Sequence, residues 1–297
     1  MRPVSAFLRV SLAALLIVAN IVVHVLPLFA VTLLKALLPF ERVRLACNPL
    51  LAGIAESWIA FNSGVIDRLT HTRFVVSEHA DLRRDGHYLV LANHQSWVDI
   101  FVLQKRFNRR IPLLRFFLKR ELFWIPLMGL AWWALDFPFM RRHTREQIAR
   151  RPELAGRDIE TTRRACARFR AIPVSIMNFV EGTRFTPEKH ASQASPYRNL
   201  LKPRSGGVAF VIDAMGDGLQ SILDVTLVYP AGRPTMVDLF ADRVPEVRID
   251  VRERPIPREF VGGDYQGDAR FRERFQEWMN ALWEDKDATC ERLLGRA

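Results

Sequence analysis

The sequence predicts a large α/β domain that follows an N-terminal membrane-embedded helical segment, and three observations lead to this fold class. Short apolar runs rich in strand-forming residues, such as 88–92 and 175–179, alternate with stretches of helical periodicity. Residues 10–34 contain no charged side chain, and so long an apolar stretch is typical of a membrane helix. The 297 residues are enough for one large domain with an appendage.

Residues 1–45 are interpreted as the membrane anchor. As one helix, residues 10–34 would extend about 37 Å, which is enough to cross the hydrocarbon core of a bilayer. Pro27 could instead divide the segment into a helical hairpin that dips into one leaflet. The sequence leaves these two alternatives open. A cleaved signal peptide is disfavoured, because the apolar run is long and no A-x-A site closes it.

The remaining elements follow from periodicity and turn residues. Residues 46–70 are expected to form an amphipathic linker helix, on which Trp58 and Phe61 suit either a membrane interface or packing against the domain. Residues 71–297 form the globular domain. Strands are expected near 72–77, 88–92, 112–118, 137–142, 175–179, 222–229, 235–240 and 246–252, and helices near 97–107, 208–215 and 268–295.

The chain is strongly basic, which indicates an anionic partner. Its net charge is +11 and its pI is about 10.3, values that suit nucleic acid, anionic lipid or an anionic substrate. The arginine-rich residues 143–171 are expected to form a solvated helix face that could meet anionic head groups. No recognisable nucleic-acid motif accompanies them. The three cysteines are far apart and lack metal-ligand spacing, which favours a reducing compartment and no metal site.

Residues 88–99, YLVLANHQSWVD, carry the first candidate site. A buried strand is expected to end at Ala92, and Ser96 to cap a helix that begins at Trp97. His94 lies at this junction, and Asp99 in the first helical turn could bind one nitrogen of its ring and make the other a better base. The alternative is that Ser96 and Asp99 form an ordinary capping box and His94 is a loop histidine.

Residues 180–184, VEGTR, carry the second candidate site. They follow an expected strand, and their glycine, hydroxyl and guanidinium suit a phosphate, because glycine admits close backbone approach and the other two groups donate hydrogen bonds. Glu181 repels phosphate, so it is expected to orient Arg184 or to bond a sugar or glycerol hydroxyl. An ordinary turn is the alternative interpretation of this short motif.

Residues 119–142, KRELFWIPLMGLAWWALDFPFMRR, form an apolar stretch with cations at both ends. Core packing is the default interpretation of such a stretch. A surface loop and helix that lines an acyl groove or dips into lipid is the alternative.

Four separated segments resemble the glycerolipid acyltransferases, the family that includes 1-acyl-sn-glycerol-3-phosphate acyltransferase, and the likeness is strongest to lysocardiolipin-type members and their bacterial membrane relatives. NHQSWVD at 93–99 matches the H-x4-D motif, and residues 119–142 match the second block. FVEGTRFTPEK at 179–189 matches the third block, with Val180 in place of its usual proline, and VTLVYP at 225–230 resembles the fourth. The resemblance covers roughly residues 70–290, and it implies a mixed sheet flanked by helices, as in glycerol-3-phosphate acyltransferase.

The resemblance also implies an activity and roles for residues. An acyl group would pass from acyl-CoA or acyl carrier protein to the free hydroxyl of a lysophospholipid, most often 1-acyl-glycerol-3-phosphate, to give phosphatidic acid. His94 would be the general base and Asp99 would orient it. The residues that would hold the acceptor's glycerol phosphate are Glu181, Gly182, Thr183, Arg184, Arg142 and Lys119. Pro126, Gly129 and Pro230 would shape the acyl or donor channel.

The same resemblance implies no cofactor and no metal, contacts with anionic membrane lipids and no nucleic acid. It places the active site on the cytoplasmic face of the inner membrane. Remodelling of another lysophospholipid, such as lysophosphatidylglycerol or lysocardiolipin, remains an alternative with the same catalytic residues. A membrane-anchored scaffold with an inactive domain would be expected to lack one of the motif residues, all of which are present. The sequence has neither a G-x-S-x-G nor an H-E-x-x-H motif, which disfavours hydrolase and zinc-enzyme alternatives.

Overall fold

The computed structural model describes residues 3–38, 40–140, 169 and 172–296. Within these residues, six strands form one sheet in the order β1-β8-β7-β2-β6-β3. Their bounds are Arg73–His79 for β1, His87–Ala92 for β2, Leu114–Phe116 for β3, Val174–Phe179 for β6, Ser221–Val228 for β7 and Glu246–Arg254 for β8. Neighbouring strands run parallel except for β7 and β8, which are antiparallel. The expected mixed α/β sheet is therefore confirmed.

Strand β2 lies in the interior of this sheet. It pairs in parallel with β6 on one side and with β7 on the other, and all its residues except His87 are buried. A parallel strand covered on both faces is apolar throughout rather than alternating, which is why residues 88–92 contain no polar position. The end of β2 is consequently a fixed point from which the first candidate site begins.

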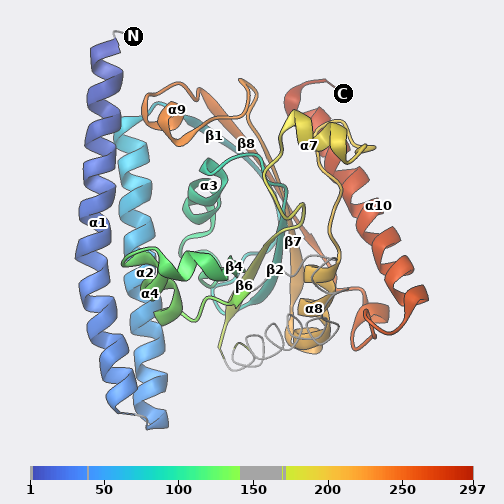
Figure 1. The fold of residues 1–297 in the computed structure, drawn as a ribbon, viewed down its shortest axis with the longest axis horizontal. Helices are drawn as coiled ribbons and strands as arrows, with labels where there is room; N and C mark the ends of the chain where they lie inside the picture. Colours follow the sequence, from blue (N-terminus) through green and yellow to red (C-terminus); the bar gives the residue numbers. More distant parts are fainter. Residues whose placement is uncertain (1–2, 39, 141–168, 170–171, 297) are drawn as a thin grey trace.

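Helices cover both faces of the sheet (Figure 1). One face packs against α3 (Val98–Phe107), α4 (Met128–Ala134) and α9 (Met236–Phe240), and the other against α8 (Gly206–Met215) and α10 (Ala269–Leu294). Smaller elements join these layers: the 3₁₀ helices η1 (Arg120–Trp124), η3 (Gly216–Gly218) and η4 (Arg258–Phe260), helix α7 (Pro187–Ser192), and a second sheet of β4 (Leu118–Lys119) and β5 (Phe139–Met140).

The N-terminal residues form two long antiparallel helices that lie side by side (Figure 1), α1 (Pro3–Leu37) and α2 (Glu41–Leu69). Helix α1 continues through Pro27 without a break, and α2 begins five residues before the expected linker helix. Both helices are long and apolar enough to cross a membrane. The buried Asn20 joins them, because its amide donates to Asn62 Oδ1 at 2.9 Å and to the Trp58 carbonyl at 3.1 Å.

Helix α1 is also tied to the globular domain near both of its ends. Arg9 pairs with Asp242 at 2.7 Å, and Lys35 pairs with Asp136 at 3.5 Å. Helix α4, which shortly precedes Asp136, and helix α9, which shortly precedes Asp242, also contact α1. The first helix therefore lies along the domain rather than extending away from it.

Some expectations about elements were wrong. Residues 235–240 form helix α9 rather than a strand, because Thr235 and Asp238 make a capping box at its start. In the expected strand 112–118, only Leu114–Phe116 pair within the main sheet. Of the expected strand 137–142, only Phe139–Met140 is a strand in the described residues, and Arg142 and most of the arginine-rich stretch 143–171 lie outside them. Helix α3 begins at Val98, whose amide donates to Ser96 Oγ at 3.0 Å.

Candidate active site

The first site begins where the chain leaves β2. The buried Asn93 takes over the hydrogen bonding of the strand, since its amide donates to the Leu227 carbonyl at 2.8 Å and its Oδ1 accepts from the Leu227 amide at 2.9 Å. The backbone is thus free to turn at His94 while remaining attached to β7. His94 is held further by its carbonyl, which accepts from the Phe185 amide at 2.8 Å.

The Asp99 carboxylate is the hydrogen-bonding centre of this turn. Its Oδ2 accepts from His94 Nδ1 at 2.8 Å and from the amides of Gln95 and Ser96 at 2.6 and 2.9 Å. Both sequence interpretations therefore apply, since Asp99 caps the helix and also binds the imidazole. With Nδ1 bonded to the carboxylate, Nε2 is the ring nitrogen that can accept a proton from a substrate.

The His94 ring is fixed from its flat side as well. Phe179, the last residue of β6, stacks on it with ring centroids 3.9 Å apart and an interplanar angle of 12°. The side chain of His94 is 12% exposed, whereas that of Asp99 is fully buried. The orientation of the imidazole is thus fixed by the protein itself.

Sequence reasoning missed a third member of this group, Tyr229. It is buried directly after β7, and its hydroxyl donates to Asp99 Oδ1 at 2.6 Å. Burial, with the negative charge of Asp99, holds the pKa of Tyr229 well above its ordinary value, so the hydroxyl keeps its proton. The signal was present, because Tyr229 belongs to the VTLVYP segment, but nothing local in the sequence pairs it with a helix 130 residues away.

Glu181 lies beneath this turn and is almost fully buried. Its Oε1 accepts from the His94 amide at 3.4 Å, whereas Oε2 has no hydrogen-bond partner among the described residues. Burial raises the pKa of Glu181 to about 8. The structure thus pairs Glu181 with the backbone of His94, and Arg184 instead lies over the Trp97 ring, with its guanidinium carbon 4.9 Å from the centroid.

A basic cavity of about 550 Å³ brings the second and third sequence blocks together. Gly182 and Thr183 line it beside Lys119, so three of the residues that were assigned to the acceptor phosphate lie around one cavity. The turn at Gly182 has φ of +69°, a conformation that favours glycine. The other residues that line the cavity are Glu121, Lys189, Gln193 and Arg204.

Two of these cavity cations, Lys189 and Arg204, were not predicted as site residues. The ammonium of Lys189 donates to Thr183 Oγ1 at 2.8 Å and to the Arg184 carbonyl at 2.9 Å. The backbone amide of Arg204 donates to the Val180 carbonyl at 2.9 Å, which holds its segment against the same turn. Lys189 is the last residue of the FTPEK part of the third block, and that position was its only signal.

Two of the predicted channel residues, Pro126 and Pro230, lie in turns, and the third, Gly129, lies in helix α4. Pro126 joins η1 to α4, and Pro230 is exposed in the loop after β7. A Cβ at Gly129 would lie 1.8 Å from the Phe123 carbonyl oxygen, so this glycine permits η1 and α4 to touch. Arg142 lies outside the described residues. Within those residues, no group of three or more His, Cys, Asp or Glu side chains is arranged to hold a metal ion.

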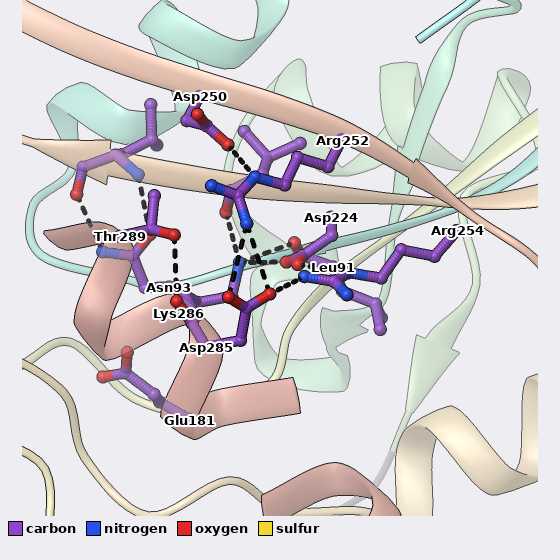
Figure 2. Close-up of polar contacts among 12 residues, drawn as sticks. Leu91, Asn93, Glu181, Asp224, Asp250, Arg252, Arg254, Asp285, Lys286 and Thr289 are labelled. Atoms are coloured by element: carbon purple, nitrogen blue, oxygen red, sulfur yellow. Dashed lines mark hydrogen bonds and ion pairs between the residues drawn. The ribbon is translucent and has the colours of Figure 1, made fainter. Parts of the chain in front are cut away.

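A buried ionic network lies behind β2 and β7 (Figure 2). The fully buried ammonium of Lys286, from α10, donates to Asp224, to the Val225 carbonyl at 2.7 Å and to the Leu91 carbonyl at 3.5 Å. Arg254 donates to Asp224 at 2.8 Å and also pairs with Asp285. Helix α10 is thereby connected to the strand that ends at the first site.

Fold and site together define a class: an α/β domain with a helical hairpin, in which a histidine oriented by a buried carboxylate lies near a basic cavity. A sequence model of the acyltransferase family matches residues 73–230, a little over half of the chain. The chain belongs to the acyltransferase family.

The chain is also similar to individual members. It is 27% identical over 235 residues to 1-acyl-sn-glycerol-3-phosphate acyltransferase 3 of Arabidopsis thaliana, covering 74% of this chain and 57% of that protein. It is 26% identical to the mouse gamma enzyme, with 69% and 53% covered, and 22% identical to mouse lysocardiolipin acyltransferase 1, with 79% and 61% covered. The chain thus spans somewhat more than half the length of these relatives. A crystal structure of PlsC from Thermotoga maritima aligns with a TM-score of 0.47 and 15% identity, over 93% of this chain and 97% of that one.

Proposed function

We propose that this protein transfers a fatty acyl group from an acyl thioester to the free hydroxyl of a lysophospholipid. The observation that carries the proposal is the oriented base: His94 Nδ1 lies 2.8 Å from the buried Asp99 carboxylate, beside a turn that lines a basic cavity. His94 Nε2 takes the proton of the acceptor hydroxyl as its oxygen attacks the thioester carbonyl. The tetrahedral intermediate then expels the thiolate, which receives that proton from the imidazolium, and Asp99 stabilises the imidazolium between the two steps.

The basic cavity supplies the site for the acceptor phosphate. Lys119, Lys189 and Arg204 provide charge, and the backbone at Gly182 allows close approach. Glu181 is neutral at pH 7 because burial raises its pKa to about 8, so it does not repel the phosphate. Glu181 is buried and is not among the cavity-lining residues, so it supports the His94 turn from beneath through the His94 amide.

Lysophosphatidate is the acceptor we propose first, because several relatives are named 1-acyl-sn-glycerol-3-phosphate acyltransferases. A remodelling reaction is the second candidate, since other relatives are named lysocardiolipin acyltransferase and 2-acyl-1-lysophosphatidylinositol acyltransferase. The donor thioester is acyl-CoA or acyl carrier protein, and no cofactor or metal enters the mechanism. The scaffold alternative is disfavoured, because His94, Asp99 and the Gly182 turn are all in place.

The membrane disposition we propose is a hairpin in one leaflet, with the domain on the cytoplasmic face of the inner membrane. Arg9 and Lys35 both pair with the domain, and these residues are about 39 Å apart along an α-helix. If α1 crossed the bilayer, the domain bound to both ends would have to cross it too. A helix that lies along the interface avoids this conflict, and the exposed apolar side chains of α1 then face lipid.

The experiment that tests the activity measures transfer from labelled acyl-CoA to a panel of lysophospholipids by membranes that contain the protein. The proposal expects transfer to lysophosphatidate, and Lys189→Ala should raise KM for this acceptor roughly tenfold, since it removes a charge-assisted contact. Lys105→Ala is the matched control, because this lysine pairs with Asp67 away from the cavity. Transfer to another lysolipid alone would favour remodelling. The absence of transfer from both acyl-CoA and acyl carrier protein would contradict the proposal.

A further inference from the structure

We propose that Tyr229 is a positioning residue of the proposed acyl transfer, and that its hydroxyl sets the orientation and basicity of His94 through Asp99. The proposal rests on His94 being the general base. It concerns a residue that touches neither substrate, because Tyr229 is buried behind the carboxylate. The contact that carries it is the 2.6 Å hydrogen bond from the Tyr229 hydroxyl to Asp99 Oδ1.

The two oxygens of the Asp99 carboxylate bind different groups. Oδ2 accepts three hydrogen bonds from the His94 turn, whereas Tyr229 is the one described residue that donates to Oδ1. No arginine or lysine of the described residues pairs with this buried carboxylate. The phenol is therefore what satisfies the second oxygen, and without it the plane of the carboxylate, and so the ring bound to Oδ2, is held less strictly.

The same hydrogen bond also changes the negative charge on the Asp99 oxygen that contacts His94. A phenol that donates to Oδ1 draws negative charge away from Oδ2, which weakens the attraction between Asp99 and the imidazolium. Removal of the hydroxyl concentrates the charge on Oδ2. The imidazole of His94 then holds a proton more strongly and becomes a free base only at a higher pH.

Other charged groups face His94 and must be considered in a titration. Asp99 approaches from α3, and Glu181 approaches from the turn after β6. Two cations face Glu181 in turn, Arg233 from the loop after β7 and Lys286 from α10. The contacts of Glu181, Arg233 and Lys286 do not involve the Tyr229 hydroxyl, so a change confined to that hydroxyl reports on Asp99 and His94.

The test compares Tyr229→Phe with Tyr88→Phe. Tyr88 is an equally buried tyrosine whose hydroxyl accepts from the Arg83 amide at 2.9 Å, remote from the site at the other end of β2. Tyr229→Phe should lower kcat roughly ten- to a hundredfold, the usual loss for a hydrogen bond to a charged group. KM should stay unchanged, and the acidic limb of the pH–rate profile should move to higher pH. Tyr88→Phe should change neither kcat nor the limb.

A second measurement uses 3-fluorotyrosine in place of the four tyrosines of the chain. Fluorination makes the phenol a stronger donor with little change in shape, so the acidic limb should move to lower pH, opposite to Tyr229→Phe. The same fluorination in a Tyr229→Phe background should leave the limb where that variant has it. The titration of the His94 ring, assigned by the NMR signal lost in His94→Ala, should follow the same two directions and needs no turnover.

The outcomes separate this inference from the proposed activity. An inactive wild-type protein, or a fully active His94→Ala, would contradict the proposed function. The role of Tyr229 alone would be overturned by a different result. In that case wild type is active and His94→Ala is inactive, but Tyr229→Phe matches Tyr88→Phe in kcat and in the His94 titration.

Discussion

At the scale of single residues, two carboxyl groups near His94 have opposite environments. Asp99 accepts four hydrogen bonds, from the imidazole, two amides and Tyr229. Glu181 is buried with fewer donors, and burial raises its pKa to about 8. In the proposed mechanism, Asp99 therefore orients the base, whereas Glu181 keeps its proton beneath the same turn.

Glu181 should leave a signature in the pH dependence of stability. In the unfolded chain, Glu181 releases its proton near the ordinary pKa of 4.5. In the folded protein it keeps this proton up to its raised pKa of about 8. Its stabilising contribution is thus complete below pH 4.5 and is lost as the pH rises through about 8. Glu181→Gln stays neutral, so thermal melting should show the variant gaining stability relative to wild type between pH 4.5 and 8.

The control for that series is Glu188→Gln. Hydrogen bonds to its own backbone and to Thr186 lower the pKa of this exposed carboxyl, so it does not titrate in that interval. A stability difference between Glu181→Gln and wild type that stays constant from pH 4.5 to 8 would contradict the assignment.

Prediction from sequence succeeded where partners are local and failed where they are distant. His94 and Asp99 are five residues apart, so the strand–helix junction already indicated their contact. Tyr229 and Lys189 join the site only through the sheet register and the turn after β6, which no local pattern records. Helix α9 was predicted as a strand because a short apolar run fits both the helical and the strand periodicity. Its T-x-x-D capping box distinguishes a helix from a strand at this position.

At the scale of elements, the hairpin of α1 and α2 is the part of the protein on which the proposed membrane disposition depends. Both ends of α1 pair with the domain, and apolar side chains stay exposed along its length and on the neighbouring η1 and α4. Those of η1, α4 and the turn between them are Trp124, Ile125, Leu127, Leu130 and Trp133. Tryptophans beside a basic cavity suit the head-group region of a bilayer. In the disposition that we propose, the hairpin, η1 and α4 therefore face lipid together.

Cysteine labelling tests this disposition. Arg9 and Lys35 lie near opposite ends of α1 on its domain-facing side, and their side chains are 30% and 21% exposed. In a chain whose three native cysteines are replaced by alanine, Arg9→Cys and Lys35→Cys, each made alone, should react with an impermeant maleimide from the same side of sealed vesicles. Ala288→Cys, on the exposed face of α10, should react from that side too and so marks the face of the domain. Labelling of the two α1 positions from opposite sides would show that α1 spans the bilayer.

At the scale of the whole molecule, α10 closes the fold and connects the C-terminal residues to the site. Lys286 is fully buried and bonds Asp224 of β7 together with the carbonyls of Leu91 and Val225. A buried ion pair is costly to break, because the remaining charge loses its partner in a medium of low dielectric. The pair therefore fixes the position of the helix more than it adds net stability.

Removal of this ammonium should be strongly destabilising. Lys286→Met leaves Asp224 with Arg254 as its remaining cation and should lower the free energy of unfolding by about 3 kcal/mol. The double variant with Asp224→Leu should recover part of that loss, which urea denaturation would measure. A single variant as stable as wild type would contradict the structural role of the pair.

The central claim is that His94 is the base in acyl transfer to a lysophospholipid. Its most direct test is the rate of acyl transfer by purified His94→Ala, beside wild type, with the labelled thioester and the best acceptor of the panel. Loss of a positioned general base typically lowers the rate by about 10²- to 10⁴-fold. We therefore expect kcat to fall by at least about 10²-fold while the variant still folds. A His94→Ala protein that transfers the acyl group at the wild-type rate would contradict the account.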